Sequence, residues 1–215
     1  VPEQWRIKKQ FMLTADEEIN ALEKTLLQPI SDAQSGTIAV INTTSGKRSG
    51  PVLLPAGIKA GSVKDASGKL HPVQQLHNGQ QVFIAADIPA FSKVLYELTD
   101  ETVKVASLFA IKNNSLSNGI ITVTWDSIYG SITALQTGNA LNYAGSFKQQ
   151  GLNGYWYVPG RNPADALSNE KVKISIEESG PVVTSINISS AAPGLHQLER
   201  KISLYAGSDM LLIEN

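Results

Sequence analysis

The 215-residue chain contains no cysteine, which excludes disulfides, thiolate catalysis and cysteine-ligated metal sites. Charged residues are scarce too, at 17% of the chain against roughly 25% in an average soluble domain. The net charge is −1, and the lysines and arginines are scattered, so no basic field favours nucleic acid. No apolar run approaches the roughly 20 residues of a membrane-spanning helix. The first residues also lack the layout of a secretory signal.

Recognisable catalytic motifs are missing as well. The three histidines, His71, His77 and His196, are not spaced as paired zinc ligands would be. The sequence has no nucleophile-elbow motif, no phosphate-binding loop and no dinucleotide-binding glycine motif. The residues alone therefore indicate neither a metal site nor a nucleophilic triad.

Carboxylates remain as candidates for glycosidase chemistry. Asp126, Asp165 and the pair Glu177–Glu178 are available, but only the fold can bring such acids together. We interpret Glu177–Glu178 as the solvated end of a strand. An enzyme built on this chain alone would need two carboxylates that meet across a cleft.

The first thirty residues predict one amphipathic helix. Apolar residues recur at spacings of three and four, on one face, at Met12, Ala15, Ile19, Leu22 and Leu26. Pro29 ends the helix, because the residue before a proline is pushed out of helical geometry. A lone amphipathic helix cannot bury its stripe, so we expect it to dock on the β part, on helices outside this chain, or on a second copy in a homodimer.

From Ser35 onward the apolar period changes to two, as strands require. The strands predicted for a small sandwich are 37–42, 51–55, 63–65, 73–76, 81–85 and 92–98. Asn78–Gly79 is a strong hairpin signal. Prolines flank the second strand, which places it at a sheet edge. The polar stretch 99–104 is the predicted linker.

A second β unit follows the linker. Its predicted strands are 119–125, 129–135, 171–177, 182–188, 197–204 and 210–213. Strands this short, with turns this regular, indicate antiparallel sheets packed face to face. We therefore expect a mainly β protein with an N-terminal helix (1–33), a small β-sandwich (34–100) and a larger sandwich (101–215). The abrupt ends of the sequence lead us to expect a piece of a longer protein.

Residues 151–166 (GLNGYWYVPGRNPADA) carry three consecutive aromatic residues in a chain that is 7% aromatic. Tyrosine and tryptophan join a flat apolar ring to a polar group, which suits the C–H faces and hydroxyl edges of sugars. Two interpretations stay open. The segment is either a carbohydrate site that also uses Arg161, or a buried strand with Tyr155 and Tyr157 on one face and Trp156 on the other.

Five motifs follow one another in the second β unit: Asn118–Val123, Gly130–Leu135, Glu177–Val183, Ile202–Asp209 and Ile213–Asn215. Their order resembles the C-terminal sandwich of the class II α-mannosidases, glycoside hydrolase family 38. The earlier segments are similar to the end of that family's helical bundle and its small middle β-domain. The resemblance covers nearly the whole chain and implies a galactose-mutarotase-like antiparallel sandwich for residues 101–215.

The resemblance also implies a division of labour within a larger enzyme. The family hydrolyses α-mannosides with a zinc ion and an aspartate nucleophile, and its His-x-Asp and His-His-Asp motifs belong to an N-terminal barrel. Neither motif occurs here, so we expect no catalytic residue, no metal ligand and no activity in this chain alone. The expected partners are an α-mannoside and the missing barrel, with neither nucleic acid nor a membrane. We favour a periplasmic or extracellular location over a cytoplasmic one.

The same resemblance nominates substrate-binding residues. Asn153–Tyr155, followed by Val158–Pro159, matches the family segment whose tyrosine reaches the sugar, which selects Tyr155. A shift of one residue would select Trp156, and Arg161 is the third candidate. The rival interpretation of the whole chain is a stand-alone carbohydrate-binding or structural β-module with no catalytic partner.

Overall fold

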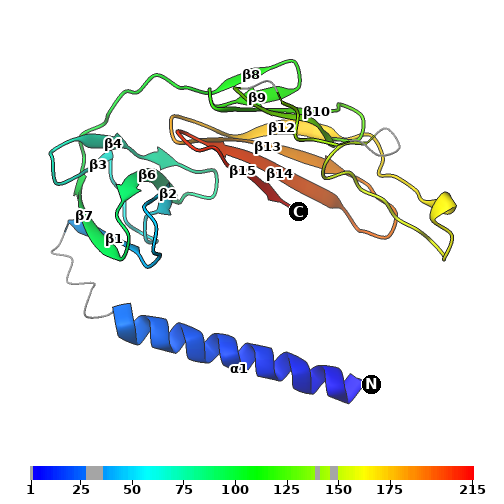
Figure 1. Ribbon diagram of the computed structural model, residues 1–215, viewed down its shortest axis with the longest axis horizontal. Coiled ribbons are helices and arrows are strands. Elements are labelled where there is room, and N and C mark those ends of the chain that lie inside the picture. The colour runs from blue at the N-terminus through cyan, green and yellow to red at the C-terminus, as the bar shows by residue number, and fades with distance from the viewer. Residues whose placement is uncertain (1, 28–35, 139–140, 146–149) are drawn as a thin grey trace.

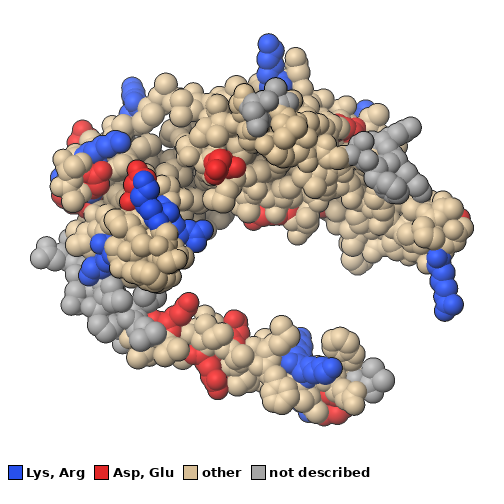
Figure 2. Space-filling view, viewed as in Figure 1, with Lys and Arg blue, Asp and Glu red and all other residues tan. Residues whose placement is uncertain are grey.

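The computed structural model describes residues 2–27, 36–138, 141–145 and 150–215. Over these ranges the protein is mainly β, with one α-helix, fifteen strands and four antiparallel sheets (Figure 1). The fold class expected from the sequence is thus confirmed. Among the described helices, none has the length and apolar character needed to cross a membrane. Figure 2 shows lysines and arginines scattered over the visible face, without a broad basic patch.

Helix α1 (Pro2–Leu27) forms where the apolar spacing predicts it. Every described side chain of the helix, from residue 2 to residue 25, is exposed, and the helix stands apart from the sheets in Figure 1. Met12, Ile19 and Leu22 are 75%, 57% and 59% exposed. The helix therefore does not dock on the small sandwich in this structure, and its pairing in a homodimer stays a prediction. Pro29 and the expected boundary at residues 33 and 34 lie outside the described residues.

The first β unit is a sandwich of two small sheets. One sheet has the order β1 (Thr37–Asn42), β7 (Ser92–Thr99), β3 (Ser62–Lys64), β4 (Leu70–Pro72). The other has the order β2 (Arg48–Leu53), β6 (Gln81–Ile88), β5 (Gln74–Gln75). Strand β2 is an edge strand, as its prolines predict, and Asn78–Gly79 turns β5 into β6. Phe83 and Tyr96 meet edge to face in the core between the sheets.

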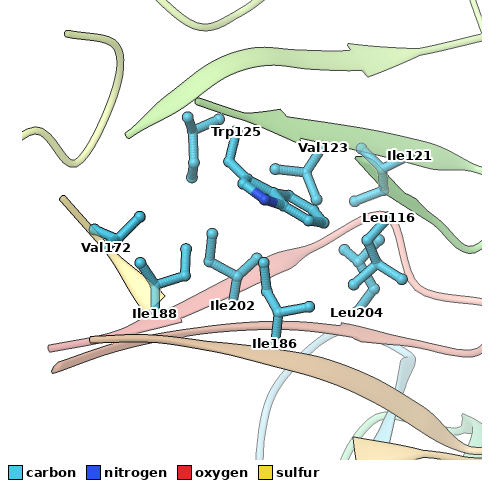
Figure 3. Packing of buried hydrophobic residues seen from close by; sticks show 10 residues of the cluster. Leu116, Ile121, Val123, Trp125, Val172, Ile186, Ile188, Ile202 and Leu204 are labelled. Carbon is cyan, nitrogen blue, oxygen red and sulfur yellow. The ribbon is translucent and has the colours of Figure 1, made fainter. Parts of the chain in front are cut away.

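The second β unit packs two four-stranded sheets against each other. One has the order β11 (Ile132–Thr137), β10 (Ile121–Trp125), β9 (Ser115–Ser117), β8 (Ala110–Lys112). The other has the order β12 (Lys173–Ser179), β13 (Val183–Ser190), β14 (Leu198–Tyr205), β15 (Leu211–Glu214). Figure 3 shows Val123 and Trp125 of the first sheet facing Ile186, Ile188 and Ile202 of the second. This period-two alternation is what the sequence displayed.

Three strands were not expected from the sequence. Strands β8 and β9 form a hairpin around Asn113–Asn114, whose φ angles are +48° and +59°. Asparagine tolerates this left-handed region, so Asn-Asn is itself a turn signal. Strand β4 has only three residues, of which the middle one is His71. Too few residues alternate in these strands for a period to be visible.

The two β units are joined by a buried glutamine. Gln74 of β5 donates from Nε2 to the carbonyl of Val183 at 2.9 Å. Its Oε1 accepts the backbone N–H groups of Val182 and Val183, each at 2.9 Å. Gly180 precedes this contact, and a Cβ there would lie 2.3 Å from the Gln74 Cδ atom. The glycine at position 180 is therefore explained by the approach of a side chain from the other unit.

Charged residues beside this joint correct one expectation. Glu178 is buried, and its Oε1 accepts the backbone N–H of His77 at 2.8 Å. Glu177 is half-buried and forms an ion pair with Lys201 at 3.1 Å. The interpretation of Glu177–Glu178 as a solvated strand end is therefore wrong. The local sequence does not show that the small sandwich approaches this end of β12.

Candidate functional site

The aromatic segment is a loop rather than a strand. Gln150, the residue just before it, is buried. Gln150 accepts the N–H of Tyr155 through Oε1 at 3.1 Å and donates from Nε2 to the Ser168 hydroxyl. Gly154 lies against the same side chain, where a Cβ would come 2.6 Å from the Gln150 Oε1 atom. One buried glutamine thus sets the curvature of the loop from within.

The loop is also fixed to the start of strand β11. Leu152 and Ile132 exchange two backbone hydrogen bonds, each of 2.8 Å. The N–H of Gly151 donates to the Ser131 hydroxyl at 3.0 Å. A Cβ at Gly151 would meet the Ile132 carbonyl oxygen at 1.8 Å, so no larger residue fits this contact. The loop therefore runs as a short extra segment along the β8–β11 sheet.

Arg200 connects the loop to the β12–β15 sheet. Its side chain is 2% exposed, and it donates from Nη1 to the carbonyl of Asn153 at 3.0 Å and from Nη2 to the carbonyl of Tyr129. Burial lowers the pKa of the guanidinium, and the charge of Asp126 opposes that shift. Asn153 has a φ of +60° and donates from Nδ2 to Asn215 Oδ1 at 3.0 Å. Residues from β14 and from the end of β15 thus converge on one turn of the loop.

The three aromatic side chains have different surroundings. The Tyr155 hydroxyl donates to the carbonyl of Pro193, and the Tyr157 ring covers Gly194 in the same β13–β14 turn. Trp156 is half-buried. The backbone of Tyr157 pairs with Leu167 in an isolated bridge. Tyr155 and Tyr157 therefore share one contact surface, as the strand interpretation had it, but the loop is neither a strand nor fully buried.

Arg161 lies in the exposed tip of the loop. Asn162 follows it and caps the 3-10 helix η2 (Pro163–Asp165) by accepting the N–H of Ala164. Figure 1 shows this tip, in yellow, beyond the end of the second β unit. The structure thus places Tyr155 and Trp156 at the base of the loop and Arg161 at its tip.

The carboxylates that the sequence offered are used locally or lie apart. Asp126 accepts the backbone N–H groups of Ile128 and Tyr129 and so caps its own turn. Asp165 is exposed in η2. Glu177 and Glu178 line one cavity on the outer face of the β12–β15 sheet together with a third carboxylate, Glu214. The motif Ile213–Asn215 contains Glu214 but gave it no role, because only strand register brings it there.

Histidine and acidic side chains do not cluster into a metal site in the described ranges. No group of three or more His, Asp or Glu there could hold a metal ion. His71 forms a local pair with Asp65, whose Oδ2 lies 2.8 Å from Nε2. The described residues therefore do not fit a zinc ion.

Comparisons with known proteins place this geometry on a known fold. No family model matches the sequence, and no curated protein matches it either. Among solved structures, the chain is similar to a glycosyl hydrolase family 38 protein from Enterococcus faecalis, with 11% identity and a TM-score of 0.52. That match covers 82% of this chain and 30% of the other. An α-mannosidase from Enterococcus faecalis V583 matches with 12% identity and a TM-score of 0.47, over 85% of this chain and 30% of the other. The likeness to the first is one of fold, and the chain spans less than a third of that protein.

Proposed function

We propose that the chain is the β-sandwich portion of an α-mannosidase-like glycoside hydrolase. In this role it shapes the cleft in which a separate domain hydrolyses an α-mannoside. The observation that carries the proposal is the fold likeness, which covers 82% of this chain and 30% of a family 38 protein. Coverage of most of this chain but less than a third of the other protein favours a portion of a larger enzyme. The order of the five motifs in residues 118–215 supports the same family.

The anchored loop is the part of the chain that we assign to the cleft. Buried or half-buried groups from β11, β14 and the β13–β14 turn hold its base. Such preorganisation is what a substrate-positioning residue requires. The hydrogen bond from the Tyr155 hydroxyl to the Pro193 carbonyl positions the ring that Tyr155 offers to the sugar. Trp156 lies beside this ring, and Arg161 lies at the tip of the loop.

Zinc belongs, in this proposal, to the domain outside the chain. The described residues do not fit the ion, and we assign no step of hydrolysis to them. This chain contributes contacts and exclusion of water at one wall of the cleft. The galactose-mutarotase-like topology of residues 101–215 is part of the same proposal.

Kinetics of the full-length gene product test the loop assignment. Tyr155→Phe should lower kcat/KM for an aryl α-mannoside at least tenfold, a loss of about 1.4 kcal/mol of transition-state stabilisation. Tyr157→Phe is the matched control, because the Tyr157 ring rests on Gly194, and it should leave the kinetics unchanged. If Tyr155→Phe is also silent while Trp156→Phe slows hydrolysis, the sugar contact moves by one residue. If all three are silent, the loop does not line the cleft.

A further inference from the structure

The outer face of the β12–β15 sheet is hollowed where the two β units meet. Two adjoining cavities, of about 230 Å³ and about 100 Å³, share Glu177, Lys201 and Glu214 as lining residues. We call this hollow the outer trough. Figure 1 shows the small sandwich standing at one end of the β12–β15 sheet, and the trough extends to its His77 and Asn78.

Strand register places the polar groups of the trough in one row. Asn187 of β13 pairs with Lys201 of β14, which pairs with Glu214 of β15. Side chains at paired positions point to the same face of a sheet. Glu177 reaches into the row from β12 and bonds to Lys201. An amide, an ammonium and two carboxylates therefore stand side by side across four strands.

The central ion pair is sunk into the surface. The side chains of Lys201 and Glu177 are 31% and 27% exposed. The two lysine–carboxylate pairs on the small sandwich are 37% to 71% exposed. The Lys201–Glu177 pair is therefore less exposed than either of those two pairs.

Tyr205 forms an apolar wall at the small-sandwich end. Its ring packs against a buried cluster that includes Val82 and Val183 from the two units. Burial raises the pKa of Tyr205, and the charges of Glu214 and Glu178 raise it further against an opposing effect of Lys201. The hydroxyl is therefore a protonated donor at neutral pH.

We infer that the outer trough is a binding subsite for a neutral, hydroxyl-rich ligand, namely a sugar ring of a glycan. Carboxylates accept hydrogen bonds from hydroxyl groups, and Lys201 and the amide of Asn187 donate them. Tyr205 offers an aromatic ring to the C–H groups of the ligand. Four carboxylates, those of Glu177, Glu178, Glu199 and Glu214, surround Lys201 in the lining, so the trough disfavours an anion. Arg200 and Asn215, which bond to Asn153 of the aromatic loop, also line the larger cavity of the trough. The inference uses other residues than Tyr155, Trp156 and Arg161 and does not rest on the proposed function.

An NMR titration of the ¹⁵N-labelled 215-residue chain with methyl α-mannoside tests the subsite. Saturable shifts should appear at the backbone amides of Lys201, Tyr205 and Glu214. Lys201→Met should weaken the apparent affinity at least tenfold, whereas Lys173→Met, on β12 outside the trough, should not change it. Glu214→Gln should weaken it as well, and this variant leaves the Lys201–Glu177 ion pair in place.

The outcomes separate this inference from the proposed function. Shifts in the trough support the subsite, whatever the loop does. Shifts confined to residues 150–161 support the loop as a sugar contact and overturn the subsite. The absence of shifts up to the solubility limit of the sugar also overturns it. So does stronger binding of spermidine than of the sugar, which would identify the trough as a cation site.

Discussion

Gln74 of the small sandwich holds both backbone polar groups of Val183 in the large one. Its Nε2 donates to the Val183 carbonyl, and its Oε1 accepts the Val183 N–H, each at 2.9 Å. The two residues are 109 positions apart in sequence. A single carboxamide thus bonds to both backbone polar groups of Val183 at the start of β13. It also fixes one β unit against the other.

Replacing Gln74 with alanine should destabilise the chain by about 1 to 3 kcal/mol, because buried backbone groups at residues 182 and 183 lose their partner. Equilibrium unfolding in urea measures the change. Gln75→Ala is the matched control, since Gln75 is the exposed neighbour in β5, and it should stay within about 0.5 kcal/mol of the parent. Equal effects of both substitutions would show that the joint contributes nothing to stability.

Gly180→Ala should cost a similar amount for a steric reason. The added Cβ would lie 2.3 Å from the Gln74 Cδ atom, and overpacking of this kind costs typically about 1 to 3 kcal/mol. Gly160→Ala is the control, because no atom lies within 4 Å of a Cβ there. In a Gln74→Ala background the cost of Gly180→Ala should shrink, since the obstructing amide is gone. If Gly180→Ala costs as much free energy of unfolding in the Gln74→Ala background as in the parent, the proposed contact between the two residues is contradicted.

The joint between the two β units also shows which parts of the fold could be predicted from the sequence and which could not. The alternation at 37–42 and 182–188 predicted strands whose observed bounds lie within two residues of the predicted ones. Gly180 and Pro181 lie within the motif Glu177–Val183 that the sequence showed, but nothing in the sequence pointed to their partner Gln74. Contacts between units depend on how two sheets approach, and no local period records that approach.

The candidate site was predictable in part for the same reason. Tyr155, Trp156 and Tyr157 stood out by composition, and the structure places them in one anchored loop. The groups that anchor it, Gln150 and Arg200, looked like ordinary polar residues. Only the fold shows that they are buried, at 2% exposure each.

Arg200→Lys should loosen the aromatic loop. A lysine ammonium lacks the guanidinium fork that now reaches both Asn153 and Tyr129. The loss of one hydrogen bond from a charged donor corresponds to about 1.5 to 3 kcal/mol. Hydrogen exchange should accelerate at the amides of residues 151–155 more than in the β13 core. Arg161→Lys, in the exposed loop tip, should leave the exchange unchanged, and the same pattern in both variants would contradict the tether.

Asp65 predicts a pH-dependent contribution to stability. Hydrogen bonds from Ser67 and His71 hold the pKa of its carboxyl well below the usual range. A pKa that is lower in the folded than in the unfolded state stabilises the fold above the unfolded value, about 4, and this benefit is lost as the pH falls further. Asp65→Asn should therefore lower the urea midpoint at neutral pH, with a difference from the parent that narrows below about pH 4. Asp209→Asn, at an exposed position, should show no difference in urea midpoint from the parent that depends on pH.

The rate of aryl α-mannoside hydrolysis tests the central claim most directly, when it is measured with added zinc on the 215-residue chain and on the full-length gene product. The account predicts turnover by the full-length product and none by the chain alone. Turnover by the purified chain, or none by a folded full-length product, would contradict it.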